Sequence, residues 1–509
     1  MGSRSNSYLH LMIIAALVWS LPAARAQAAG DPPLAFTERM ALLSRIEPGE
    51  TFYPISLKVS ADNAHVAYAA KNQKGMFAVL DNQRGGYSEA VAKGTPLIGP
   101  GQLHWAYVAY PGQRKAQAVI DLRPEPPFDG IDAFVFSPDG SRWAYRAGKD
   151  GKQAVVVNGV AQPAFDLIDI RTGPRFSPDG RRLAYGALNG KEGALVVDGT
   201  TLKVDGSVEQ IVFSPDAKRL AYILLQKDNG RQVVLDGQAG PFFQKISALT
   251  FSPDSRRCAY MALKGSAWVA VVDGKEMIGG DSVGTPLFSP DSRRLAYAAN
   301  LGKEWFMVVD GKKGRTFDEL GISMFSPDSA RLAYMAQMKE RACLVVEDQM
   351  GPIFDSVGEP VFSPDSKQLA YRARQGSKWC VVQNGKPHQT FYDGLRRPIF
   401  SPDGGHLAYV AIEGKEMIMV LDERPLSRHD SVTFPFFSPR GTRVVYAGCT
   451  KDQWRVFVDG TAGKTIFDAT LKDSTITFEA ENRCRMIVLK MPGPEFHRLD
   501  LEIAGSPSP

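Results

Sequence analysis

The chain has 509 residues, of which 44% are hydrophobic, and a formal net charge of +5. This composition excludes an intrinsically disordered chain and supplies ample apolar material for a large buried core. A charge so close to neutral for this size gives no electrostatic case for binding nucleic acid or a membrane surface. The five cysteines have no metal-site spacing and do not indicate a disulfide scaffold, so we expect them to be buried as small apolar residues.

The N-terminal segment has the features of a signal peptide. Arg4 precedes an apolar run over residues 11–23, and small residues follow at positions 24, 26 and 28, which is cleavage-site spacing. We therefore expect residues 1–28 to be a signal peptide and residues 29–50 to be a linker. The mature protein is then periplasmic or secreted and has no transmembrane domain. A retained N-terminal membrane anchor is the alternative.

Beyond residue 50 the chain repeats itself at steps of 37 to 40 residues. Each repeat carries Phe-Ser-Pro-Asp followed by Leu-Ala-Tyr, or a close variant. Nine clear copies begin at Phe136, Phe176, Phe213, Phe251, Phe288, Phe325, Phe362, Phe400 and Phe437. Two degenerate copies near Val59 and Ile98 precede them, and a faint copy at Phe478 follows. The sequence therefore predicts twelve repeats that cover nearly all of the mature chain.

Within one repeat the pattern predicts four short antiparallel strands, a to d. Strand a ends at the Phe, and Ser-Pro-Asp forms a type I turn. Strand b contains Leu-Ala-Tyr, whose Tyr we interpret as a packing residue. Strand c is rich in Val and ends in Asp-Gly or Asn-Gly, a strong hairpin signal, so strand d follows and often ends in Phe-Asp, as at Phe165-Asp166. Four strands in about 38 residues form one blade of an all-β propeller.

These Ser-Pro-Asp-Gly repeats resemble those of the TolB-like, WD-type β-propellers of the periplasm. The resemblance covers the twelve repeats, roughly residues 51–505, and does not extend to the whole of TolB, because residues 29–50 are too few for the separate N-terminal α/β domain of that family. The resemblance implies a propeller fold and, because family members serve as interaction scaffolds in the cell envelope, a role in protein binding. TolB-like propellers usually have six blades.

The number of rings is a separate question. One ring of twelve blades leaves a very wide hole, so we expect two tandem six-bladed rings. The first then comprises residues 51–274 (repeats 1–6) and the second residues 275–505 (repeats 7–12), with 506–509 as a tail. Seven plus five blades, or one large ring, are the alternatives. We expect a lone strand d at residues 51–55 to complete the last blade.

Four tryptophans are the candidate binding residues. Trp268, Trp305, Trp379 and Trp454 each lie 17 residues after the Phe of their repeat, at the start of strand c, and Met417 occupies the same place. Earlier repeats have Gln153, Gly193 and Gly230 there. Because core packing favours similar volumes, this bias toward the C-terminal half predicts a contact surface on the face that carries the b–c turns and d–a connections. Packing between blades is the alternative.

Other sequence features weigh against a catalytic or metal-binding function. Gly280-Asp281-Ser282-Val283-Gly284 matches the nucleophile-elbow pattern but falls on a connection from strand d to strand a, without the required helix. The seven histidines are scattered, and we expect His65, His104 and His406 to be solvated turn residues. An Asp and an Arg three residues later recur in six turns, and we expect a turn-stabilising pair, with a charged ring that faces a partner as the alternative. These pairs are Asp139/Arg142, Asp179/Arg182, Asp216/Arg219, Asp254/Arg257, Asp291/Arg294 and Asp328/Arg331.

We therefore expect a non-enzymatic, exported propeller scaffold that binds a protein, peptide or glycan. We expect no catalytic residue, no cofactor, no metal and no nucleic-acid partner. A glycan- or peptide-binding sensor, or an enzyme with its active site at the ring centre such as a lyase or hydrolase, is the alternative. An enzyme would be expected to break the repeat with convergent polar residues near the ring axis, and the repeats mostly conform there.

Overall fold

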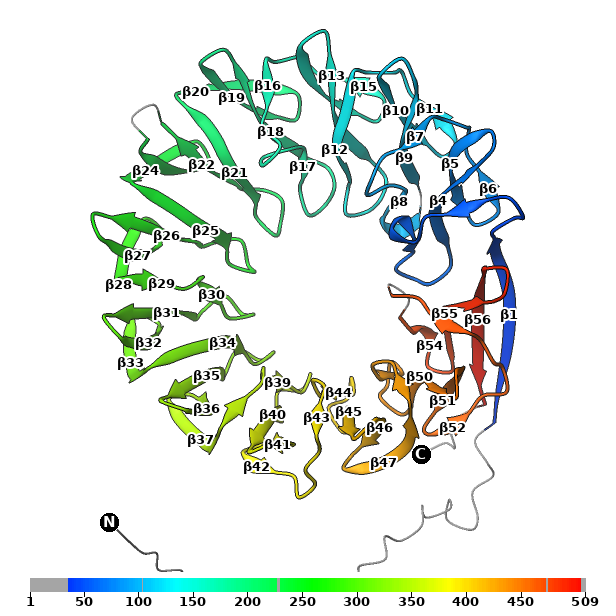
Figure 1. Cartoon of the computed structure of the whole chain (residues 1–509). Helices are drawn as coiled ribbons and strands as arrows, with labels where there is room; N and C mark the ends of the chain where they lie inside the picture. Colours follow the sequence, from blue (N-terminus) through cyan, green and yellow to red (C-terminus); the bar gives the residue numbers. More distant parts are fainter. Residues whose placement is uncertain (1–34, 103, 227–228, 473–474, 505–509) are drawn as a thin grey trace, which may run out of the picture.

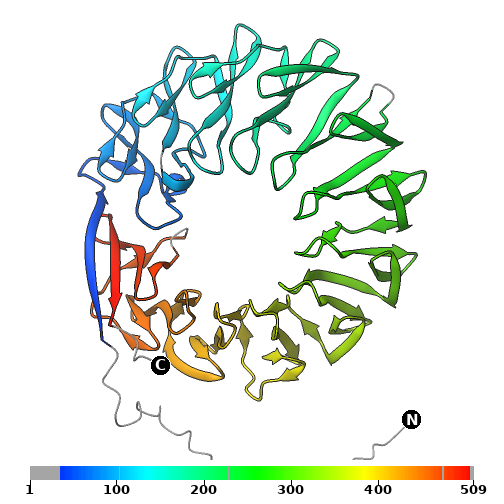
Figure 2. The same ribbon diagram turned by 180° about the vertical axis from the view of Figure 1, so that it is seen from behind.

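The predicted turns join the strands into twelve four-stranded antiparallel sheets, and these form one closed ring (Figure 1). The computed structural model describes residues 35–102, 104–226, 229–472 and 475–504. Strand a lies nearest the centre of the ring and strand d lies at the outside, and the reverse view shows the same ring (Figure 2). The all-β propeller class and the count of twelve blades are confirmed. The signal peptide expected over residues 1–28 lies outside the described residues.

The two middle strands form the continuous part of each blade. The b strands are β4 (Val66–Asn72), β9 (Trp105–Gly112), β13 (Trp143–Lys149), β18 (Leu183–Asn189), β22 (Leu220–Leu225), β26 (Cys258–Lys264), β31 (Leu295–Leu301), β35 (Leu332–Met338), β40 (Leu369–Gln375), β45 (Leu407–Glu413), β50 (Val444–Thr450) and β55 (Arg483–Lys490). The c strands are β5 (Gly75–Leu80), β10 (Lys115–Ile120), β14 (Lys152–Val157), β19 (Glu192–Val197), β23 (Arg231–Leu235), β27 (Ala267–Val272), β32 (Glu304–Val309), β36 (Arg341–Val346), β41 (Lys378–Gln383), β46 (Glu416–Leu421), β51 (Gln453–Val458) and β56 (Glu495–Ile503).

The inner and outer strands are shorter, and strand a is split into two segments in eight blades. The a strands are β2 (Thr51–Phe52) with β3 (Lys58–Val59), β7 (Ala90–Val91) with β8 (Leu97–Ile98), β12 (Gly130–Phe136), β16 (Leu167–Ile168) with β17 (Arg175–Phe176), β21 (Ser207–Phe213), β25 (Lys245–Phe251), β29 (Ser282–Val283) with β30 (Leu287–Phe288), β34 (Glu319–Phe325), β38 (Ser356–Val357) with β39 (Val361–Phe362), β43 (Gly394–Leu395) with β44 (Ile399–Phe400), β48 (Ser431–Val432) with β49 (Phe436–Phe437), and β53 (Ala469–Thr470) with β54 (Thr477–Ala480). The d strands are β6 (Gln83–Arg84), β11 (Arg123–Pro124), β15 (Val160–Ala161), β20 (Thr200–Val204), β24 (Gln238–Phe243), β28 (Lys275–Gly280), β33 (Lys312–Phe317), β37 (Gln349–Phe354), β42 (Lys386–Pro387), β47 (Arg424–His429), β52 (Thr461–Ala462) and β1 (Phe36–Arg45). Of two short 3-10 turns, η1 (Pro54–Ser56) lies between the two segments of the first inner strand, and η2 (Pro100–Gln102) follows the second inner strand, before β9.

The turn between strands a and b is closed by its own side chains. In the third blade, Ser137 donates to Asp139 Oδ1 (2.5 Å) and accepts a hydrogen bond from the Arg142 N–H (2.9 Å). These bonds leave no unpaired group on the Ser137 side chain, which is fully buried. The hydrogen bonds from Ser137 and Ser141 lower the pKa of Asp139 to about 2. The Ser-Pro-Asp motif therefore encodes a turn that stabilises itself.

The turn between strands c and d confirms the hairpin prediction. Both residues of Asp198-Gly199 have positive φ, 51° and 80°, as a two-residue hairpin turn of this kind requires. The Asp has a second role, because Asp198 Oδ1 accepts a hydrogen bond from the Leu183 N–H at the start of strand b (2.8 Å). Asp is therefore favoured at this position both by its conformation and by its bond to the neighbouring strand.

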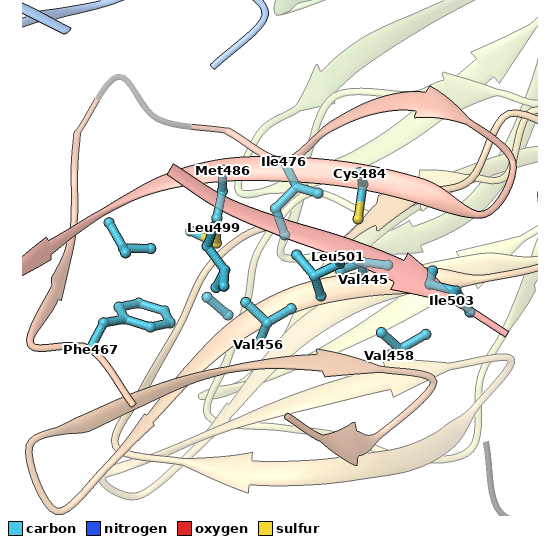
Figure 3. Close-up of a cluster of buried hydrophobic side chains, with 12 residues drawn as sticks. Val445, Val456, Val458, Phe467, Ile476, Cys484, Met486, Leu499, Leu501 and Ile503 are labelled. Carbon is cyan, nitrogen blue, oxygen red and sulfur yellow. The ribbon is translucent and has the colours of Figure 1, made fainter. Parts of the chain in front are cut away.

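The core lies between neighbouring blades. Ten of the eleven repeat tyrosines are buried, and Tyr222 is half-buried, so the packing role predicted for this position is confirmed. In Figure 3 the side chains of Val445 and Val456 in one blade point toward those of Leu499 and Leu501 in the next. The five cysteines are all free and buried within the strand pattern, as expected. Each blade thus buries its faces only by packing on its neighbours.

One ring forms instead of the two six-bladed rings that we preferred over residues 51–274 and 275–505 (Figure 1). The boundary between the sixth and seventh blades is packed like the others: Ala259 and Val272 share one buried cluster with Val283 and Phe288. A break there would expose this apolar surface on both sides. The alternative of one large ring is therefore the arrangement that the structure adopts.

Ring closure uses a different segment from the one expected. β1 pairs antiparallel with β56 from Phe36↔Ile503 to Arg45↔Glu495 and so supplies strand d of the last blade. Thr51–Phe52, which we expected to be that strand, pairs with β4 inside the first blade. The closing strand therefore lies in the segment assigned to a linker. A bulge between Leu42 and Ser44 breaks its alternation, which removed the period-two signal.

Candidate functional site

The four predicted tryptophans occupy one structural position, on the face of the ring that carries the b–c turns. Each is the second residue of strand c and pairs across to strand b: Trp268 with Leu263, Trp305 with Asn300, Trp379 with Arg374 and Trp454 with Cys449. All four side chains are half-buried. They are neither enclosed between blades nor free of them, so a contact role for their exposed edges stays a prediction.

The surroundings of the tryptophans differ from blade to blade. Trp268, Trp379 and Trp454 each pack against a buried inter-blade cluster. Trp454 also stacks on Phe467, which lies between β52 and β53, with ring centroids 6.5 Å apart. The inter-blade packing that we considered as the alternative therefore accounts for part of each of these three side chains.

The strand pairing corrects one member of the series. In the fifth blade Arg231, and not Gly230, occupies the position of the tryptophans, because Tyr222 pairs with Val234 as Tyr260 pairs with Val271. The turn before strand c is one residue longer in this blade, which shifted the count from the Phe. Arg231 forms an ion pair with Glu209 at 2.7 Å.

Arginines that the sequence reasoning missed surround Trp379. The guanidinium of Arg372 lies 5.2 Å from the Trp379 ring centroid, and that of Arg374 lies 6.0 Å from it. On the next blade, Arg396 lies 5.3 Å from the Phe434 ring, whose residue is 51% exposed. We call these five residues the arginine–tryptophan patch. Its sequence signal was available, because most repeats place a small or apolar residue where Arg372 stands.

The patch continues from one blade to the next through backbone contacts. Arg372 Nη1 donates to the carbonyl of Leu395 (2.8 Å), the residue directly before Arg396. Arg396 Nη1 in turn donates to the carbonyl of Val432 (2.9 Å) on the following blade, and its Nη2 contacts Sδ of Met417 at 3.5 Å. The patch therefore spans the ninth to eleventh blades, drawn from yellow to orange in Figure 1.

The recurring Asp and Arg of the turns do not pair with each other as expected. Arg219 Nη1 reaches the next blade and donates to the carbonyls of Ser255 (3.1 Å) and Arg256 (2.7 Å), while its guanidinium covers the Phe251 ring at 5.5 Å. Its Nε bonds Asp236 of its own c–d turn at 2.8 Å. These arginines therefore link neighbouring blades, and the turn Asp is held by the turn itself.

The histidines divide into two groups. His65, His104 and His406 stand where other blades have the linking Arg, and each bonds the Asp of its c–d turn at 2.6 to 2.7 Å, so they are paired and not merely solvated. The hydrogen bond to Asp81 raises the pKa of His65. His429, by contrast, is buried, and desolvation lowers its pKa.

Ser282 does not lie in a strand–turn–helix elbow. It lies on β29, and its hydroxyl donates to Asn300 Oδ1 at 2.7 Å. Within the described ranges, no group of three or more His, Cys, Asp and Glu side chains is arranged to hold a metal ion. The same part of the chain contains no helix long and apolar enough to cross a membrane.

Clefts also recur between blades near the c–d turns. One of about 300 Å³ lies between the fifth and sixth blades, and one of about 410 Å³ lies between the seventh and eighth. Arg219 and Asp236 line the first, and Arg294 and Asp310 hold the same places in the second. These clefts repeat with the blade and are lined by the residues that link blades.

No protein-family model matches the chain, and a search of curated proteins finds no match. Among solved structures, the chain is similar to a eukaryotic initiation factor (14% identity, 64% of this chain and 96% of that chain, TM-score 0.35). It is also similar to TolB from Acinetobacter baumannii (17% identity, 52% of this chain and 78% of that chain, TM-score 0.23). A third similar structure is the β-propeller domain of the Trilobed protease from Pyrococcus furiosus (14% identity, 50% of this chain and 95% of that chain, TM-score 0.25). Because these TM-scores are low, the assignment of blades rests on the strand pairing and not on these similarities.

Proposed function

We propose that this protein is a non-enzymatic binding scaffold that holds a partner protein on the face carrying the b–c turns. One observation carries the proposal: four tryptophans at a single repeat position stay half-exposed on this face. Large aromatic side chains with an exposed edge supply contact area at low conformational cost and are enriched in protein interfaces. A position whose only role is packing would hold similar volumes in every blade.

The occupants of this position around the ring support the same proposal. Gln153 and Gly193 hold it in the third and fourth blades, and Ala342 holds it in the eighth. A partner that contacts the seventh, ninth and eleventh blades would therefore meet tryptophan in each. We place this partner in the cell envelope or the extracellular space, because the N-terminal sequence has the features of a cleavable signal.

The test is capture of a partner by the mature chain. The bait is residues 29–509, immobilised and exposed to envelope extract, and the matched variant is Trp379→Ala with Trp454→Ala. We expect one protein to be captured stoichiometrically and the double variant to capture it about tenfold less, as for loss of an aromatic hot spot. Circular dichroism of the double variant checks that the ring is intact.

Two results would contradict the proposal. Capture that is equal for the two baits would remove the tryptophans from the interface. Turnover of a glycan or peptide by the purified chain would favour a ring-centre enzyme over a scaffold. N-terminal sequencing of the native protein tests its location, and we expect the mature chain to begin near Gln27 or Ala29.

A further inference from the structure

The arginine–tryptophan patch contains three arginines, and their ion pairing differs from that of the arginines that link blades. Arg372, Arg374 and Arg396 form no ion pair with any residue that the structure describes, whereas most of the arginines that link blades do, as Arg219 does with Asp236. Arg372 and Arg396 are half-buried, and Arg374 is exposed. Cations held close together and partly out of water repel one another, so an anion bound among them lowers the free energy of the site.

The acids near the patch are already engaged by other cations. Asp355 lies 3.6 Å from Arg341. Glu359 lies 3.6 Å from Arg397, and Asp393 lies 2.7 Å from Lys378. The patch therefore carries a local surplus of three positive charges on a chain whose total is only +5.

Arg146 in the third blade shows what the same position looks like when its charge is neutralised. Like Arg372, it donates to a carbonyl of the next blade, that of Ile168 (2.6 Å). Asp132 stands opposite it on strand a and forms an ion pair with it at 2.5 Å. In the ninth blade the residue opposite Arg372 is Gly358, where an added Cβ would lie 2.6 Å from Arg372 Cγ. The fold thus accommodates Arg372 and leaves its charge without a counter-ion.

We infer that the arginine–tryptophan patch binds a carboxylate-rich segment of a partner protein. Arg374 and the free nitrogens of Arg372 offer the paired N–H groups that match a carboxylate. Phe434, and Phe391 at 39% exposure beside Tyr392, offer apolar surface for the side chains between the acids. Charge complementarity and adjacent aromatic contacts together favour an acidic peptide with apolar residues. This inference rests on the proposed binding function and assigns the chemistry of its partner.

The experiment measures binding of defined peptides to the full mature ring by fluorescence anisotropy. The probe is a labelled octapeptide of alternating Glu and Leu, and the control probe replaces every Glu with Gln. We expect saturable binding of the acidic peptide only, weakened by raising the salt concentration. Arg374→Gln and Arg372→Gln should each raise its Kd about tenfold, whereas the matched Arg146→Gln should leave the Kd unchanged.

Every outcome decides the inference. Equal binding of the two peptides, no saturable binding, or an unchanged Kd for Arg374→Gln would overturn it. Because the Arg374 side chain is exposed, this variant tests the site without a folding defect. Tighter binding of an oligoglucuronate than of the peptide would assign the carboxylates to a glycan and overturn the protein partner. If envelope extract yields a partner whose capture is insensitive to Arg372→Gln, the scaffold function stands and this site fails. If extract yields no partner, the proposed function fails independently of the peptide result.

Discussion

The single residue after each Ser-Pro-Asp turn, an arginine or histidine in most blades and Gln368 in the ninth, determines how that blade is linked to its neighbours. Arg219 combines hydrogen bonds to two carbonyls, an ion pair and a cation–π contact, and all but the ion pair reach the next blade. His406 keeps only the bond to Asp422 within its own blade. His104 reaches the next blade through a ring contact, with its centroid 4.9 Å from that of Trp143, where Arg219 uses hydrogen bonds to the carbonyls of the next turn.

His429 is the residue at which pH should act on the fold. It occupies the position held by Phe317 and Phe354 in other blades, and its Nε2 bonds Ser427 Oγ (2.7 Å), which bonds the Tyr446 hydroxyl (2.5 Å). Burial lowers the pKa of His429 below its ordinary value of 6.5, against a smaller raising effect of Asp430. The unfolded chain therefore binds a proton more readily than the folded chain, and the contribution to stability is present above pH 6.5 and is lost as pH falls.

We expect the melting temperature of the wild-type protein to fall more steeply between pH 7.5 and pH 5 than that of His429→Phe. The phenyl ring restores the residue found in neighbouring blades and removes the titrating group. Melting curves followed by circular dichroism across this range measure the difference. His65, whose pKa is shifted upward, and His388, whose pKa is lowered by burial, are common to both proteins and cancel in the comparison. Parallel pH profiles would show that His429 does not titrate there.

At the scale of one element, β1 closes the ring. It pairs along nine residue positions with β56, which lies about 450 residues later in the chain. Phe36 and Met40 pack against the cluster between the last two blades, and Leu43 packs against the cluster between the last and first blades. β1 therefore ties together both neighbours of the last blade.

Met40→Asp should destabilise the protein by about 3 kcal/mol, because it removes an apolar contact and places an unpaired charge against the buried cluster. Leu42→Asp is the matched control, since it makes the same chemical change on β1 at a side chain that is 41% exposed. We expect this control to cost less than about 1 kcal/mol. Denaturant unfolding followed by tryptophan fluorescence measures both variants. A similar loss for the two would mean that β1 contributes little beyond its backbone pairing.

At the scale of the whole molecule, stability comes from neighbouring blades covering each other's faces. Each blade contacts the next through one buried cluster, and the ring brings the last blade against the first, where Tyr68 and Phe496 pack together. A ring of this kind has no exposed terminal blade, whereas an open array needs a capping repeat at each end.

Residues 29–274 and 275–509 expressed separately should therefore be poorly soluble, and co-expression should yield a single complex with the mass of the intact chain. Splitting the chain there exposes the apolar faces of the first, sixth, seventh and last blades. Size-exclusion chromatography with mass determination tests this expectation. Two monodisperse halves, each melting like the intact protein, would show instead that each half is an independent ring.

Much of the blade could be predicted from the sequence, because its signals are local. The type I turn depends on Ser137 and Asp139, two residues apart, and the hairpin turn depends on the adjacent residues Asp198 and Gly199. The tryptophan position was predicted for the same reason, since it is a fixed step from the Phe. It was misplaced only in the fifth blade, where one extra residue in the b–c turn shifted the step to Arg231.

The sequence by itself determined that this protein is a propeller of twelve blades, because spacing within a repeat sets the strands and turns. Only the tertiary structure decided that the blades form one ring, that β1 closes it, and that Arg372, Arg374 and Arg396 gather around aromatic side chains on one face. These features depend on contacts between blades and on the angle at which successive sheets pack. The pattern within a single repeat predicts neither the pairing of residues hundreds of positions apart nor that packing angle.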